Sequence, residues 1–380
     1  MTLPPLALYV HIPWCEKKCP YCDFNSHTSP NIPEDDYVSH LINELQQYRQ
    51  VLQIRPLHSI FFGGGTPSLF SAPAIARILT AVSAIGSLED NCEITLEANP
   101  GSAEQSRFKG YRQAGVNRLS IGVQSFNSDH LKRLGRIHNH DEAINAIKAA
   151  QSAGFDNINI DLMYGLSQQT LAQALSDIEQ AIALNPQHIS WYQLTIEANT
   201  AFYNAPPPLP AEDNIIAIEE AGRALLLQHG FARYEVSAYA QPNLRSKHNM
   251  NYWEFGDYLG IGAGAHSKLT DENGAIRRIA NTRLPQHYLD RNAIKASTES
   301  SLTPADKRFE FMMNALRLVD GVDVTLFEQR TGETLQSITP TITAMTKSQH
   351  MQSPQRAQRL ACTKEGYELL NSVVEQFLED

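Results

Sequence analysis

Residues 6–22 read LALYVHIPWCEKKCPYC, and this stretch carries the strongest indication of fold and function in the chain. An apolar run, Leu6–Val10, has the length and composition of a buried strand, and three cysteines follow it at Cys15, Cys19 and Cys22. Three thiols on one short loop point in different directions, so they cannot all pack into a core. Soft sulfur ligands in this arrangement are typical of an iron–sulfur cluster or a zinc site.

The spacing of the cysteines helps to separate these two kinds of metal site. Structural zinc sites usually close with four ligands and use pairs of cysteines two residues apart. Here three residues and then two separate the cysteines, no second pair follows, and zinc would need His11 or His27 as a further ligand. A 4Fe–4S cluster held by three thiolates leaves one iron open to a ligand. The spacing favours the cluster, and zinc remains the alternative.

Strand-like and helix-like segments alternate along the first half of the chain. Such alternation indicates βαβ units and a parallel sheet. Because no dinucleotide-binding glycine pattern accompanies the six repeats, the predicted fold is an α/β partial (β/α)6 barrel rather than a doubly wound sheet. The predicted strands are Leu6–Val10, Ser59–Phe62, Glu93–Glu97, Arg118–Val123, Asn157–Leu162 and His188–Leu194. The predicted helices are Tyr37–Val51, Ala74–Ile85, Ala103–Ala114, Asp141–Ala153 and Leu171–Ala183.

The regular alternation ends near residue 201, where a proline-rich turn, residues 204–210, begins a different pattern. We predict three parts: a core at 1–240, a barrel extension at 241–300, and a small helical or winged-helix-like domain at 301–380. The expected elements after the turn are a helix at Ala211–His229, an edge strand at Phe231–Ala240, a strand at Tyr258–Leu269, and helices at Thr303–Leu318 and Thr363–Leu378.

Composition limits the classes of partner and the compartment. The formal net charge of −10 over 380 residues argues against a nucleic-acid-binding surface. No apolar stretch reaches the roughly 18 residues of a membrane span, although peripheral membrane contact is compatible with the sequence. The first residues lack the basic segment and cleavage site of a signal peptide. Five cysteines, three of them clustered, do not form a disulfide framework, so we predict a reducing, cytoplasmic location.

Polar and glycine residues follow several of the predicted strands. In a barrel, such strand ends gather at one face and form the site. Gly64, Gly65 and Thr66 follow the second strand, and glycine lets backbone amides approach a ligand closely. Glu97 could accept hydrogen bonds from a ribose diol, and Arg136 could bind a carboxylate. Gln124 and Asp161 complete the set of strand-end residues.

The cysteine spacing resembles that of the radical S-adenosylmethionine (SAM) superfamily. In order and spacing, the segments YVHIPWCEKKCPYC, FFGGGTPS, LEANP, SIGVQSF and NIDLMYGL are similar to the oxygen-independent coproporphyrinogen oxidase family. The resemblance implies a 4Fe–4S cluster on the three cysteines and SAM bound beside it, and assigns no catalytic residue. The implied SAM-site residues are Tyr9, Tyr21, Gly64, Gly65, Thr66, Glu97, Gln124, Arg136 and Asp161.

Three features favour a heme-chaperone-like branch of that family over its porphyrinogen-oxidising enzymes. The enzymes carry a further cysteine where this chain has Asp23-Phe24, and a longer segment where fourteen residues precede Cys15. Residues 248–253 read HNMNYW and match the motif proposed to hold heme in the chaperone branch.

The residues of this motif suit heme chemically. His248 would supply an axial imidazole ligand, and Tyr252 and Trp253 flat apolar faces. Arg245 and Lys247 could meet the propionates. His266 is the alternative axial ligand.

The resemblance therefore implies a protein that binds heme and transfers it to an acceptor, with a respiratory enzyme as the expected acceptor. Cluster and SAM would form a retained scaffold that takes electrons from a donor protein, and a homodimer is compatible with this role. The alternative is a radical SAM enzyme that decarboxylates coproporphyrinogen III.

Overall fold

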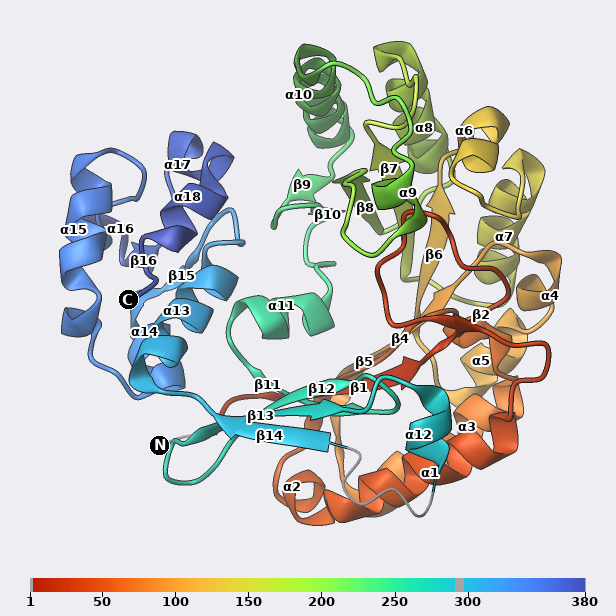
Figure 1. Ribbon diagram of the computed structural model, residues 1–380, viewed down its shortest axis with the longest axis horizontal. Helices are drawn as coiled ribbons and strands as arrows, with labels where there is room; N and C mark the ends of the chain where they lie inside the picture. The colour runs from red at the N-terminus through yellow and green to blue at the C-terminus, as the bar shows by residue number, and fades with distance from the viewer. Residues whose placement is uncertain (1–2, 291–296, 380) are drawn as a thin grey trace.

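The computed structural model describes residues 3–290 and 297–379, and among them one twelve-stranded sheet forms the body of the protein (Figure 1). The strand order is β14 (Ser297–Ser301), β13 (Ile276–Asn281), β12 (His266–Thr270), β11 (Asp257–Ile261), β1 (Leu6–Ile12), β4 (Leu57–Gly64), β5 (Leu88–Ala98), β6 (Arg118–Gln124), β7 (Ile158–Tyr164), β8 (His188–Gln193), β10 (Ala238–Ala240) and β9 (Ala232–Arg233). The six predicted strands lie side by side in its middle and run parallel.

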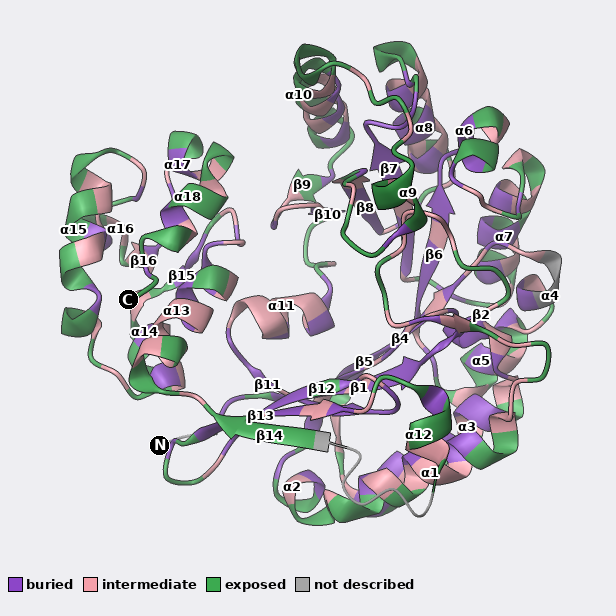
Figure 2. Cartoon of the chain, in the orientation of Figure 1, coloured by how far each residue is buried: buried purple, intermediate pink, exposed green. Residues whose placement is uncertain are grey.

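Helices cover one face of this curved sheet, with their apolar sides against the strands and their polar sides in solvent (Figure 2). Side-chain caps fix where several of them begin; Asn139 and Thr170 each form a capping box. The helices are α1 (Glu34–Gln47), α2 (Arg49–Ile54), α3 (Ala72–Ile85), α4 (Ser102–Gln105), α5 (Phe108–Ala114), α6 (Ser128–Arg133), α7 (His140–Ser152), α8 (Leu171–Ala183) and α10 (Glu212–Gln228). The short α9 (Ala201–Asn204) instead lies beside the cysteines, where the Phe202 amide donates to the Pro20 carbonyl at 2.9 Å. The predicted partial barrel is confirmed.

The sheet continues beyond the six central strands on both sides. β11 joins β1 in parallel, and β12, β13 and β14 add an antiparallel meander. On the other side, β10 and β9 pair in antiparallel fashion next to β8. In the described residues β14 and β9 form opposite edges of one sheet, so the barrel remains open.

Some predicted elements were wrong in detail. Tyr258–Leu269, expected as one strand, is the hairpin of β11 and β12, because Gly262 and Gly264 adopt positive φ angles of 100° and 81° and reverse the chain. Phe231–Ala240, expected as one edge strand, is likewise the hairpin of β9 and β10. Thr363–Leu378 is two short helices, α17 (Lys364–Glu368) and α18 (Leu370–Glu375).

The C-terminal part has a core of its own, so the predicted small helical domain is confirmed; the exact domain boundaries stay a prediction. Phe311, Phe327 and Leu360 form its centre, and Phe255 and Tyr234 join it from the sheet side. Its elements are α13 (Pro304–Ala315), β15 (Val322–Asp323), α14 (Val324–Thr331), η2 (Leu335–Ser337), α15 (Thr339–Lys347), α16 (Pro354–Ala357) and β16 (Arg359–Leu360), followed by α17 and α18. Between the barrel and this domain lies α11 (Lys247–Trp253) (Figure 1).

A buried ion cluster holds the barrel extension to the core, and it generates a stability prediction. Asp257 is fully buried and accepts hydrogen bonds from Arg55 and Lys268, both at 2.9 Å. Asp257→Ala leaves two buried cations unpaired, so we expect a loss of about 3–5 kcal/mol in the free energy of unfolding. Asp35→Ala breaks an exposed pair with Arg77 and should cost only about 0–1 kcal/mol. Denaturant unfolding measures both, and equal losses would contradict the assignment.

Candidate functional site

The cysteine loop is held at the carboxyl edge of the central strands. After β1, the short strand β2 (Trp14–Cys15) pairs with β3 (His27–Thr28), which closes the loop. Within the loop, the Cys22 amide donates to the carbonyl of Cys19 at 3.2 Å. Cys15, Cys19 and Cys22 are free and half-buried, and all three line one cavity of about 490 Å³. That volume is within the roughly 300–1,000 Å³ typical of small-molecule sites.

The glycine loop after β4 packs directly against the cysteine loop. The amide of Gly65 donates to the carbonyl of Ile12 at 2.8 Å, and the amide of Thr66 donates to that of Trp14 at 2.7 Å. A Cβ on Gly65 would lie 2.4 Å from the Trp14 carbonyl oxygen, and Gly64 has a φ of 116°. Only glycine therefore permits the close approach of this loop to the cysteine loop. Both Gly64 and Gly65 line the cavity.

Asn99 joins the two loops to the cysteines, and the sequence did not identify it as a site residue. Its amide nitrogen donates to Thr66 Oγ1 at 3.1 Å, and Thr66 in turn donates to Cys15 Sγ at 3.5 Å. Its oxygen accepts from Arg136 at 2.6 Å, and Arg136 also donates to Cys19 Sγ at 3.7 Å. The signal that could have found Asn99 is its place two residues after Glu97, on the same side of an extended chain.

Two carboxyl groups form the opposite wall of the cavity. Glu97 accepts the amide of Gly64 at 3.2 Å, and Asp161 accepts from Ser120 at 3.2 Å and from Asn159 at 2.7 Å. Burial, together with the charge of Asp161, raises the pKa of Glu97 to about 8. Burial also raises the pKa of Asp161. Both groups line the cavity, so a ligand with hydroxyl donors would find acceptors here.

Eight of the nine predicted SAM-site residues line this cavity, and Tyr9 is the exception. Gln124 accepts the hydroxyl of Tyr192, another lining residue that the sequence did not indicate, at 2.6 Å. Tyr21 lines the cavity and packs on a small apolar cluster around Met163. Tyr9 instead lies inside the barrel, where its hydroxyl contacts His11 Nδ1 at 3.0 Å and its ring stacks on Phe61.

The donor set fits a 4Fe–4S cluster better than zinc. Both ring nitrogens of His11 already have partners, the Tyr9 hydroxyl at 3.0 Å and the Asn25 carbonyl at 2.8 Å. Across residues 3–290 and 297–379, no three His, Cys, Asp or Glu side chains converge on one ion position. A cubane cluster binds each thiolate through a different iron, so its thiols need only face one cavity, as they do here. The buried Arg136 Nε has no hydrogen-bond partner among the residues that the structure describes.

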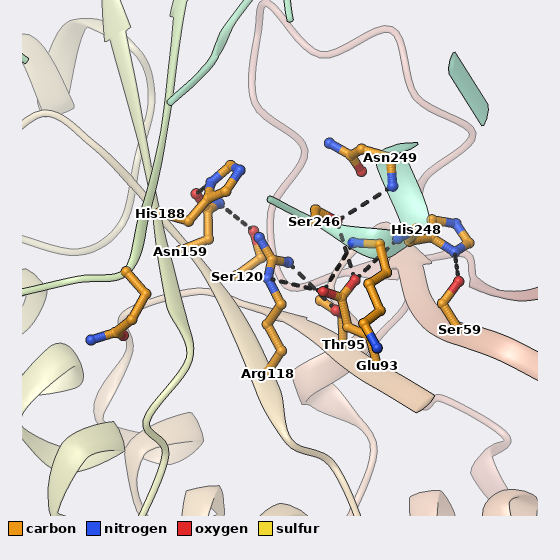
Figure 3. Close-up of polar contacts among 12 residues, drawn as sticks. Ser59, Glu93, Thr95, Arg118, Ser120, Asn159, His188, Ser246, His248 and Asn249 are labelled. Carbon is orange, nitrogen blue, oxygen red and sulfur yellow. Dashed lines mark hydrogen bonds and ion pairs between the residues drawn. The ribbon is translucent and has the colours of Figure 1, made fainter. Parts of the chain in front are cut away.

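The HNMNYW segment forms α11, and its histidine points into the barrel (Figure 3). The side chain of His248 is buried, with Nδ1 at 3.0 Å from Ser59 Oγ. Its ring stacks on Phe61 at 4.8 Å and meets Tyr252 edge-on at 5.1 Å. Burial lowers the pKa of His248 to about 3, so the imidazole is neutral, and within residues 3–290 and 297–379 its Nε2 has no hydrogen-bond partner.

The other residues that the sequence predicts to contact heme have different surroundings. Trp253 packs beneath Arg317 of the C-terminal domain at 4.6 Å. Arg245 pairs with Asp320 at 3.1 Å, and Lys247 donates to the Asn91 carbonyl, so both expected propionate partners already have contacts. His266 is exposed at the start of β12. Of the two histidines, the one with a buried, unpaired nitrogen is His248.

Comparison with known proteins first defines the class. A family model described as the radical SAM superfamily matches residues 9–179, and one described as the HemN C-terminal domain matches residues 302–369. Among solved structures, the chain is similar to coproporphyrinogen III oxidase (HemN) from Escherichia coli, with a TM-score of 0.82 and 23% identity over 99% of this chain and 90% of that one. That likeness shows the fold. The protein is a radical SAM protein, and this class implies a 4Fe–4S cluster and SAM.

Curated relatives then give the family. The chain is 49% identical to heme chaperone HemW of Haemophilus influenzae, covering 100% of this chain and 99% of the relative. It is 48% identical to heme chaperone HemW of Escherichia coli, covering 100% of both. The chain therefore belongs to the HemW heme chaperone family. This membership confirms the predicted branch and supports it over the coproporphyrinogen oxidase alternative. None of the helices in the described ranges is both long and apolar enough for a membrane crossing.

The cysteine loop gives the first prediction for the site. Changing Cys15, Cys19 or Cys22 to Ser should abolish reconstitution of the cluster, since each thiolate would bind one iron. Cys92→Ser and Cys362→Ser serve as matched controls, because both thiols are buried away from the cavity. Iron content and the visible absorption band after anaerobic reconstitution measure the result. Normal iron content in the three loop variants, or zinc in place of iron, would contradict it.

Glu97 gives a prediction about pH. If its carboxylate accepts hydrogen bonds from SAM hydroxyls, the ionised form binds better, so SAM affinity should rise as pH increases through about 8. Glu97→Gln should remove this pH dependence and weaken binding about tenfold, as for a lost charge-assisted hydrogen bond. Glu44→Gln, which changes a carboxylate outside the cavity, is the control. Calorimetric titration at several pH values tests this, and a flat profile in the unmodified protein would count against it.

Proposed function

We propose that this chain binds heme and transfers it to an acceptor protein, a respiratory enzyme being the expected class of acceptor. The observation that carries the proposal is the state of His248: a neutral imidazole whose Nε2 is buried and has no hydrogen-bond partner in the described part of the chain. A neutral imidazole nitrogen with a free lone pair is the form that binds heme iron. The relatives' name, heme chaperone, agrees with that chemistry.

Heme binding at His248 requires a local movement. Phe61 and Tyr252 pack on the ring, and His248 does not line the large cavity. Iron therefore reaches Nε2 only when these aromatic side chains shift. We propose that Tyr252 and Trp253, both half-buried on α11, then contact the porphyrin faces. His266, which is exposed, is the other candidate axial ligand.

The barrel cavity is the proposed site of cluster and SAM. Cys15, Cys19 and Cys22 would each bind an iron, and the backbone at Gly64 and Gly65 would approach the methionine end of SAM. Glu97 would accept the ribose hydroxyls, while Arg136, Gln124 and Asp161 would complete the walls, with Tyr21 packed beside the cluster. Tyr9, behind the glycine loop, would support this site without lining it. When bound, the reduced cluster supplies electrons to SAM.

The remaining proposals concern partners and location. An electron donor protein would reduce the cluster, and the acidic net charge of −10 argues against nucleic acid as a partner. We propose a cytoplasmic location with peripheral membrane contact during delivery to a membrane acceptor, and a homodimer as a compatible assembly. The proposed domains are residues 1–240, 241–300 and 301–380.

Substitution of His248 tests the proposed function. The unmodified protein should bind heme with a shifted Soret band, and the observed rate should level off at high heme concentration because the covering side chains must move first. His248→Ala should weaken binding and change the spin state of the iron, since an axial ligand is lost. His266→Ala is the matched control. A spectrum unchanged in His248→Ala but altered in His266→Ala would transfer the ligand role to His266.

A further inference from the structure

Glu93 lies at the base of α11 and takes no part in the cavity (Figure 3). It is buried on β5, and its carboxylate accepts three hydrogen bonds from the start of the helix. Ser246 Oγ donates at 3.2 Å, and the backbone amides of Lys247 and His248 each donate at 3.1 Å. The Glu93 carboxylate therefore holds the N-cap residue, Ser246, and the first two residues of the helix, of which the second is His248.

A buried cation balances this carboxylate. Arg118 Nε on β6 lies 3.9 Å from Glu93 Oε2, and Arg118 also donates to Thr95 Oγ1 at 3.4 Å. Both charged side chains are buried, and burying an ion pair costs more than burying apolar side chains of the same size. The ion pair of Glu93 and Arg118 therefore adds little to the free energy of unfolding. What it does supply is a fixed position for α11, through bonds that an apolar pair would not make.

Ser59 controls the imidazole itself. Its hydroxyl, fully buried on β4, contacts His248 Nδ1 at 3.0 Å, while Phe61, two residues along the same strand, stacks on the ring. When Nδ1 carries the proton and donates to Ser59, the lone pair lies on Nε2, which no described residue contacts through a hydrogen bond. Histidines that bind metals are held in this way, with the second nitrogen bonded to an outer partner.

We infer that Glu93 and Ser59 are positioning residues for His248: Glu93 fixes the helix that carries it, and Ser59 fixes the ring so that Nε2 is the nitrogen offered to heme iron. This inference rests on the proposed function, since it takes His248 as the ligand. Neither residue touches heme in this arrangement. Their effect on binding is exerted entirely through the position and tautomer of the imidazole.

The test compares ferric heme binding by four variants, followed by absorption and electron paramagnetic resonance of the iron. Ser59→Ala removes the hydroxyl without altering the strand, and Glu93→Gln places an amide where an acceptor is needed. Both should keep SAM affinity and helical content but weaken heme binding roughly 10- to 100-fold and reduce the histidine-ligated signal, as for loss of an outer partner of a metal ligand. Glu44→Gln, which also loses a carboxylate with three hydrogen bonds, should bind heme normally.

His248→Ala, the fourth variant, separates the two possible failures. If it leaves the iron signal unchanged, the ligand assignment itself is wrong and the positioning roles fall with it. If it alters the signal while Ser59→Ala and Glu93→Gln match the unmodified protein, the ligand assignment stands and this inference alone is overturned. Should Glu93→Gln fail to fold, Ser59→Ala decides the outcome.

Discussion

The close contact between the cysteine loop and the glycine loop is the constraint on which the site depends. Two backbone hydrogen bonds, from Gly65 to Ile12 and from Thr66 to Trp14, extend the pairing of β1 and β4 past the ends of the strands. Any side chain at Gly65 would collide with the Trp14 carbonyl. Because this contact sets Thr66 beside Cys15, the thiols face the strand-end carboxylates and amides across one cavity.

The two proposed sites share a wall inside the barrel. A Cβ on Gly63 would lie 2.9 Å from the Phe61 ring, 3.0 Å from the Tyr9 ring and 3.2 Å from the Glu97 carboxylate. Glu97 lines the cavity, whereas Phe61 and Tyr9 stack beneath it against His248. The aromatic rings that pack on His248 therefore lie close to a carboxylate that lines the cavity.

The sequence predicted those features that depend on local pattern. Six strands followed from apolar runs, and eight cavity-lining residues followed from family motifs at strand ends. The sequence did not identify Asn99 because its contacts are with Thr66 and Arg136. These residues lie 33 and 37 positions away in the chain, on other loops. Tyr9 was placed in the site by its motif, yet strand alternation turns it into the barrel.

Long-range contacts were likewise beyond prediction. Ser59 and Glu93 lie more than 150 residues from His248 in sequence, so nothing in a single chain connects them. The apolar pattern of residues 258–269 predicts one strand because only alternating glycines separate the two halves of the β11–β12 hairpin, and their positive φ angles appear only in three dimensions. The burial of His248 belongs to the same group, since HNMNYW gives no indication of which side chains cover the imidazole.

Transfer of heme from this protein to an acceptor is the central claim, and a direct measurement of heme transfer tests it best. The protein is loaded with heme, freed of excess, and mixed with a heme-free respiratory cytochrome while the Soret bands of both proteins are followed. We expect heme to leave the loaded protein and appear in the cytochrome, and we expect the same preparation with cluster, SAM and reductant not to consume coproporphyrinogen. Heme retained throughout, together with repeated turnover of coproporphyrinogen, would contradict it.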